Sequence, residues 1–103
     1  MTDKTRDEIT LGEQARFLLD NDAYKKAWAA LLDGLTELRA KTPVTDKEQA
    51  QALIICERMA LKFRKALEDF VVTGKFASDS LRLENERRSR LEALKPPWLR
   101  KTS

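Results

Sequence analysis

The chain has 103 residues, of which 36 % are charged and only three each are Gly and Pro, so it fits one small domain. Few residues are β-branched, and the composition predicts an all-α protein without a sheet. No apolar run approaches the roughly 20 residues that span a bilayer, and the polar N-terminal residues do not resemble a signal peptide. We therefore expect a cytoplasmic protein with no membrane partner.

The residues that usually carry catalysis or bind metals are scarce. The sequence contains no histidine, one cysteine, and no glycine-rich phosphate loop or nucleophile motif. We therefore expect no enzyme activity, no metal, no cofactor and no small-molecule substrate. Cys56 cannot form an intrachain disulfide, and its place among apolar residues predicts a small buried thiol rather than a reactive one.

Local signals divide the N-terminal half. Residues 1–9 lack a hydrophobic period and are expected to form a flexible arm. Thr10 and Glu13 have the spacing of a capping box, which predicts that a short helix begins there. The polar residues 20–22 favour a kink or a new N-cap. A long helix over 22–41 should follow and end at Thr42 and Pro43, because the residue before a proline avoids the α region.

A second long helix is expected over 45–74. It should begin with a capping box at Thr45 and Glu48 and end at Gly74, taken as a C′ glycine. Both long helices carry apolar residues at alternating three- and four-residue steps. In the first helix these are Tyr24, Trp28, Leu31, Leu35 and Leu38. In the second they are Leu53, Cys56, Ala60, Phe63, Leu67 and Phe70. Gly34, within the first helix, marks either a close approach or simple tolerance of glycine.

These two stripes predict the fold: an antiparallel helical hairpin of two long helices, with a short N-terminal helix and a weakly docked basic C-terminal helix. Antiparallel pairing would place Trp28 beside Phe63 and Leu38 beside Leu53. Ser78, Asp79 and Ser80 offer N-caps for the C-terminal helix over 81–94. The expected division is a flexible arm over 1–9, a hairpin domain over 10–76, and a basic helix with a Pro-Pro-Trp tail over 77–103.

Two surfaces are candidates for binding. A hairpin buries one side of each helix, so remaining apolar residues are expected to meet a second copy or another protein. These residues are Ile54, Leu61, Leu32, Trp98 and Leu99. Residues 1–74 have 12 basic and 13 acidic residues, whereas residues 75–103 have 8 and 4. The basic segment is a candidate nucleic-acid contact. The residues expected to make this contact are Arg82, Arg87, Arg88, Arg90, Lys95, Arg100 and Lys101.

Several short patterns resemble a group of small, mostly uncharacterised helical proteins of tailed bacteriophages and prophages, encoded near virion-assembly and packaging genes. The similarity covers roughly residues 11–76. It rests on the leucine pair Leu18-Leu19, the stretch from Asn21 to Trp28, the Lys41-Thr42-Pro43 break, and Val71-Val72-Thr73-Gly74-Lys75. It implies a phage setting in a bacterial host, but it brings no catalytic residues.

The leading hypothesis is therefore a non-catalytic phage assembly protein, in the host cytoplasm or incorporated in the virion. It would act in the head, the neck or the packaging machinery, and would associate with itself or with a phage structural protein. A nucleic-acid-binding accessory that uses the basic segment is the first alternative. An inhibitor of a host enzyme or defence system is the second.

Overall fold

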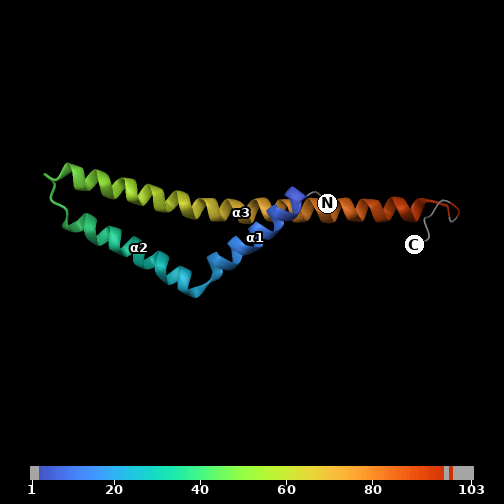
Figure 1. Ribbon diagram of the computed structural model, residues 1–103, viewed down its shortest axis with the longest axis horizontal. Coiled ribbons are helices and arrows are strands. Elements are labelled where there is room, and N and C mark those ends of the chain that lie inside the picture. The colour runs from blue at the N-terminus through green and yellow to red at the C-terminus, as the bar shows by residue number, and fades with distance from the viewer. Residues whose placement is uncertain (1–2, 97, 99–103) are drawn as a thin grey trace.

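Three helices make up the computed structural model, which describes residues 3–96 and 98. They are α1 (Asp3–Asp20), α2 (Asp22–Lys41) and α3 (Lys47–Leu94), and no strand occurs among the described residues. Helices α1 and α2 meet at an angle, α2 leads to the start of α3, and α1 crosses α3 farther along (Figure 1). The all-α prediction is confirmed.

The helix boundaries of α2 follow from local capping, as the sequence predicts. Asn21 is the N-cap, and its side-chain Oδ1 accepts a hydrogen bond from the Tyr24 N–H at 3.0 Å. At the other end Thr42 is the C-cap, directly before Pro43. The next helix begins one to two residues later than expected, because Asp46 rather than Thr45 is its N-cap and accepts from the Gln49 N–H at 3.1 Å.

Replacing Asn21 with alanine should lower the free energy of unfolding by about 1 kcal/mol, because one N–H of the first turn of α2 loses its acceptor. Thermal or urea unfolding followed by circular dichroism measures the change. Asn21→Asp keeps an acceptor and should stay close to the parent protein. An alanine variant as stable as the aspartate variant would mean that this cap contributes nothing.

Two other predicted boundaries are wrong. The first helix begins at Asp3 rather than Thr10, so residues 3–9 are helical and not an irregular arm. The long helix α3 does not end at Gly74 but continues to Leu94, so no separate C-terminal helix begins near Ser78. The division of the chain at residues 76 and 77 remains a prediction, although α3 runs through that point without a break.

The tightest packing joins α1 and α3, not the two helices of the predicted hairpin. Helices α1 and α3 cross at Gly12 and Gly74. A Cβ on Gly12 would lie 2.7 Å from the Phe70 carbonyl oxygen and 2.8 Å from Gly74 Cα. A Cβ on Gly74 would lie 2.8 Å from the Glu8 carbonyl oxygen. Gly74 is therefore glycine because another backbone passes against it.

Small residues extend this crossing by one turn on each helix. Ala15 lies three residues after Gly12, and Ala77 lies three residues after Gly74. Both alanines are buried, with 3 % and 7 % exposure. The same Gly-x-x-Ala spacing on both helices allows their backbones to approach closely. At Gly34, by contrast, an added Cβ would meet nothing within 4 Å, so this glycine is simply tolerated.

Helix α2 diverges from α3 after their connecting turn (Figure 1). The described contacts between them include an ion pair of Arg39 with Glu57, and the Arg64 guanidinium over the Trp28 ring at 5.0 Å. Phe63, the expected neighbour of Trp28, is 59 % exposed. The predicted pairing of Trp28 with Phe63 is therefore not confirmed.

The described chain is long and thin. Its principal extents are 82 × 25 × 18 Å and its radius of gyration is 23.4 Å, against roughly 13 Å for a compact domain of this length. Among the residues that the structure describes, only Ala15, Leu53 and Ala77 are buried hydrophobic residues. Most of the apolar surface therefore lies outside any core of the single chain.

Candidate functional site

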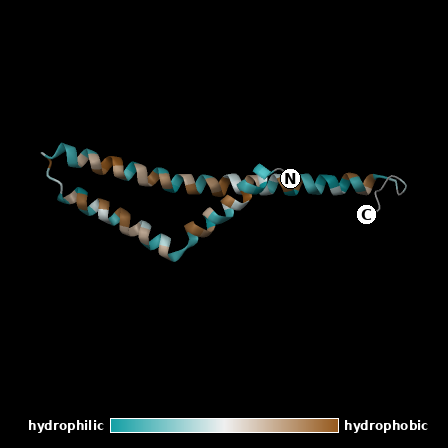
Figure 2. Cartoon of the chain, viewed as in Figure 1, coloured by the Kyte–Doolittle hydropathy of each residue, from teal (hydrophilic) through white to brown (hydrophobic). Residues whose placement is uncertain are grey.

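The most prominent surface feature is apolar side chains along the first two thirds of α3. Figure 2 shows hydrophobic residues gathered there and on α2, whereas the last third of α3 is mostly hydrophilic. The exposure of the residues agrees with this distribution, because residues 82–94, in the hydrophilic last third of α3, are all exposed. The candidate site is therefore the exposed apolar surface of α3 rather than a cavity.

Three of the five predicted interface residues lie on helices α2 and α3. Ile54 and Leu61 lie on one side of α3, two turns apart, and are 44 % and 49 % exposed. Leu32 on α2 is half-buried. Trp98, after the end of α3, is 79 % exposed. Leu99 lies outside the described residues.

The apolar stripe of α3 that the predicted hairpin would bury is partly covered and partly exposed in the structure. Leu53, Ala60 and Leu67 are buried or half-buried, on the side where Glu57 and Arg64 meet α2. The remaining members face solvent: Cys56, Phe63 and Phe70. The prediction of a buried Cys56 is wrong, because α2 reaches only one edge of the apolar band on α3.

The cationic residues of the C-terminal segment do not gather on one face. Arg82, Arg87, Arg88 and Arg90 occupy different positions around the last turns of α3. Within 77–94 they are balanced by Asp79, Glu84, Glu86 and Glu92. A phosphate-binding surface needs a local excess of positive charge, and this part of α3 lacks one.

Some of these charges also have partners in the chain. Arg88 pairs with Glu84 at 3.1 Å, and Lys95 pairs with Glu92 at 3.2 Å. The first pair joins successive turns of α3 and the second joins its last turn to its C-cap. Both pairs are exposed, and exposed pairs contribute little to stability. Arg100 and Lys101 lie outside the described residues.

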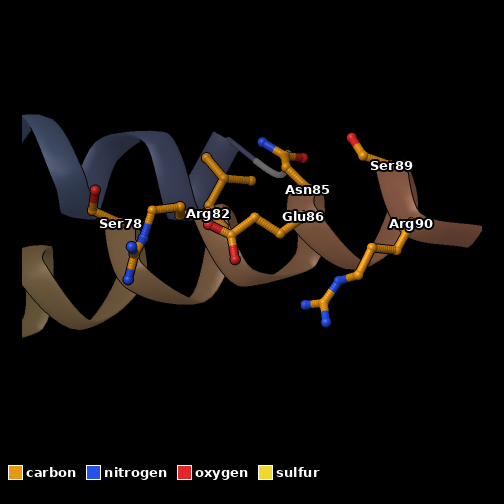
Figure 3. Close-up of a pocket in the computed structure, with 7 residues that line it drawn as sticks. Ser78, Arg82, Asn85, Glu86, Ser89 and Arg90 are labelled. Carbon is orange, nitrogen blue, oxygen red and sulfur yellow. The ribbon is translucent and has the colours of Figure 1, made fainter.

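An open hollow lies along this part of α3 (Figure 3). Arg82, Glu86 and Arg90 follow one another at four-residue spacing, so an acidic side chain separates the two guanidinium groups. The lining is completed by Ser78, Leu81, Asn85 and Ser89. All of these lining residues come from α3.

The described residues contain no group of three or more histidine, cysteine or carboxylate side chains placed to hold a metal ion. Among them, no helix is long and apolar enough to cross a membrane. Their carboxylates form ion pairs along exposed helix faces, as between Lys65 and Asp69 at 2.9 Å and between Arg64 and Glu68 at 3.2 Å.

One buried polar atom stands out on α2. The Tyr24 hydroxyl is buried and has no hydrogen-bond partner among the described residues. Burying a hydroxyl without a partner costs about 1–3 kcal/mol. Tyr24→Phe should therefore raise the free energy of unfolding by about 1 kcal/mol, as measured by the urea midpoint at fixed protein concentration. A clear loss of stability would show that the hydroxyl is hydrogen-bonded in solution.

Sequence reasoning missed the role of Gly12 and Ala15, and assigned Gly74 the wrong one. The signal that marks this crossing is the repeated Gly-x-x-Ala spacing, at residues 12–15 and 74–77. A single occurrence has many explanations, but two occurrences on two helices indicate a close contact between them.

The described residues form an elongated all-helical chain with a large exposed apolar surface. The chain matches no protein-family model, no curated protein and no solved structure.

Proposed function

We propose that the protein is a non-catalytic assembly component that associates with itself through apolar helix surfaces. The observation that carries this proposal is the mismatch between a very small core and many large exposed apolar side chains, most of them on α3. Apolar surface of this extent, on an elongated chain, is typical of a protein that completes its core with a partner.

The setting that we propose is a tailed bacteriophage, with a role in the head, the neck or the packaging machinery. This part of the proposal is supported by the sequence patterns shared with small phage proteins between residues 11 and 76. An extended helical rod also suits a component that bridges other subunits in an assembly.

Co-purification tests the phage role. The tagged chain should sediment with purified phage particles, or form a stable complex with a co-expressed head, neck or packaging protein of the same phage. A variant with Ile54→Glu and Leu61→Glu tests whether that side of α3 contributes. Absence from particles, together with failure to bind any of those structural proteins, would contradict the proposed role.

A further inference from the structure

A second apolar stripe runs along α3 beside the face that α1 and α2 cover. Its residues are uncharged, and all are exposed. We call it the outer stripe: Cys56, Met59, Phe63, Ala66, Phe70 and Thr73. Met59 is 66 % exposed and Phe63 59 %, so these two side chains contact little in the single chain, whereas Phe70, near the crossing with α1, is 39 % exposed.

We propose that the outer stripe packs antiparallel against the same stripe of a second copy of the chain. This inference rests on the proposed self-association and specifies its surface, its direction and its register. It differs from the side of α3 that carries Ile54 and Leu61.

The spacing of the outer stripe identifies a helix as its partner. Successive members are three, four, three, four and three residues apart, which is the heptad repeat of helices that pack side by side with knobs in holes. Such a repeat keeps its apolar side chains on one line as two helices wind around each other. A flat or globular partner surface would not require this spacing.

The pattern of side-chain sizes suits pairing with itself. In one antiparallel register, large residues meet smaller or flexible ones across the interface. The pairs are Phe63 with Ala66, Phe70 with Met59, and Cys56 with Thr73 of the second copy. Two-fold symmetry makes each pair occur twice, as expected for an isologous dimer.

Charges beside the stripe select this register. It brings Lys62 next to Asp69 of the second copy, and by symmetry Asp69 next to Lys62. Lys62 is exposed, and Asp69 already binds Lys65 of its own chain at 2.9 Å. Sliding the pair by one heptad would instead bring the two Lys62 residues together, which like-charge repulsion disfavours.

The same register also covers two further exposed apolar residues. Ile55, 51 % exposed, would lie next to Phe76 of the second copy, which is 74 % exposed in the single chain. A parallel pair would place Lys62 beside Leu67, so it would forgo the charge pairing. The antiparallel register therefore uses both the apolar and the charged residues on this edge of α3.

Sedimentation equilibrium of two matched variants tests the surface. Phe63→Glu should raise the dissociation constant by at least about 100-fold, because two carboxylates would be buried at the centre of the interface. The matched control is Val72→Glu, at a residue of α3 that is 67 % exposed and belongs to neither apolar surface, and it should leave the dissociation constant nearly unchanged. Leu61→Glu reports separately on the side of α3 that carries Ile54 and Leu61. Unchanged association of the Phe63 variant would overturn the outer stripe as the interface but would leave self-association standing.

Disulfide cross-linking determines whether the two α3 helices pack antiparallel. With oxidised glutathione as the oxidant, Thr73→Cys should form covalent dimers through Cys56 of the second copy. The control Cys56→Ser with Thr73→Cys should form none, because in an antiparallel pair the two residues at position 73 lie about 25 Å apart along the axis. Cross-linking of that control, or of Cys56 to Cys56 in the parent chain, would contradict the antiparallel register.

These experiments separate the two proposals. A parent chain that stays monomeric would contradict the proposed self-association itself. A parent chain that associates, but whose Leu61 variant dissociates while its Phe63 variant does not, would overturn only the inference about the outer stripe.

Discussion

Leu53→Ala is expected to lower the free energy of unfolding by about 2–5 kcal/mol, the usual range for removing a buried leucine side chain. Leu53 is 5 % exposed, and it is the only large side chain among the buried hydrophobic residues of the described chain. It lies on the face of α3 that meets α2, one turn before Glu57, which pairs with Arg39. Its loss should therefore loosen the contact between these helices.

The control for Leu53→Ala is Leu83→Ala on the same helix. Leu83 is 55 % exposed, and its truncation should change the free energy of unfolding by less than about 1 kcal/mol. Both variants are to be unfolded with urea at one protein concentration, because the proposed self-association would make stability depend on concentration. Equal effects of the two substitutions would show that Leu53 is not part of a core.

The second large effect is expected at the crossing of α1 and α3. Gly74→Ala should destabilise the protein by about 1–3 kcal/mol, even though alanine favours helix, because the new Cβ would be 2.8 Å from Gly12 Cα and from the Glu8 carbonyl oxygen. Neither neighbour is a flexible side chain that can move aside. The two helices would have to separate along their whole contact.

Gly34→Ala is the matched control for the crossing. The same substitution in the interior of α2 adds a Cβ into open space, so it should stabilise the protein by about 1 kcal/mol through helix propensity. The opposite signs of the two changes, measured by thermal and urea unfolding, test the close approach. If Gly74→Ala also stabilises the protein, the helices do not cross at this point.

Features that depend on neighbouring residues could be predicted from the sequence. The bounds of α2 follow from Asn21 at its start and from Thr42 and Pro43 at its end, and both signals act within one turn. The all-helical class follows in the same way from composition and hydrophobic period. Predicting these parts of the fold requires no information about which helices pack against each other.

Features that depend on distant residues could not be predicted in this way. A glycine followed by lysine is typical of a helix end, so Gly74 indicated one; its actual role is set by Gly12 on another helix. Similarly, the apolar band on α3 is wider than one neighbour covers. The sequence alone does not say that Leu53 faces α2 while Phe63 faces solvent.

The candidate site shows the same limit. Ile54 and Leu61 are exposed in the single chain, and their role in an interface stays a prediction. The sequence pattern does not separate the outer stripe from the helix face that the predicted hairpin would bury, because three residues of the stripe also fit the spacing of that face. These three are Cys56, Phe63 and Phe70, and only the position of α2 relative to α3 distinguishes the two roles.

The mass of the full chain in solution tests the central claim, that a second copy completes the apolar surface of α3. Sedimentation equilibrium at micromolar concentration should give twice the 11.9 kDa of one chain, with a midpoint of thermal unfolding that rises with protein concentration. A mass of one chain, together with a cooperative and concentration-independent thermal transition, would contradict the claim.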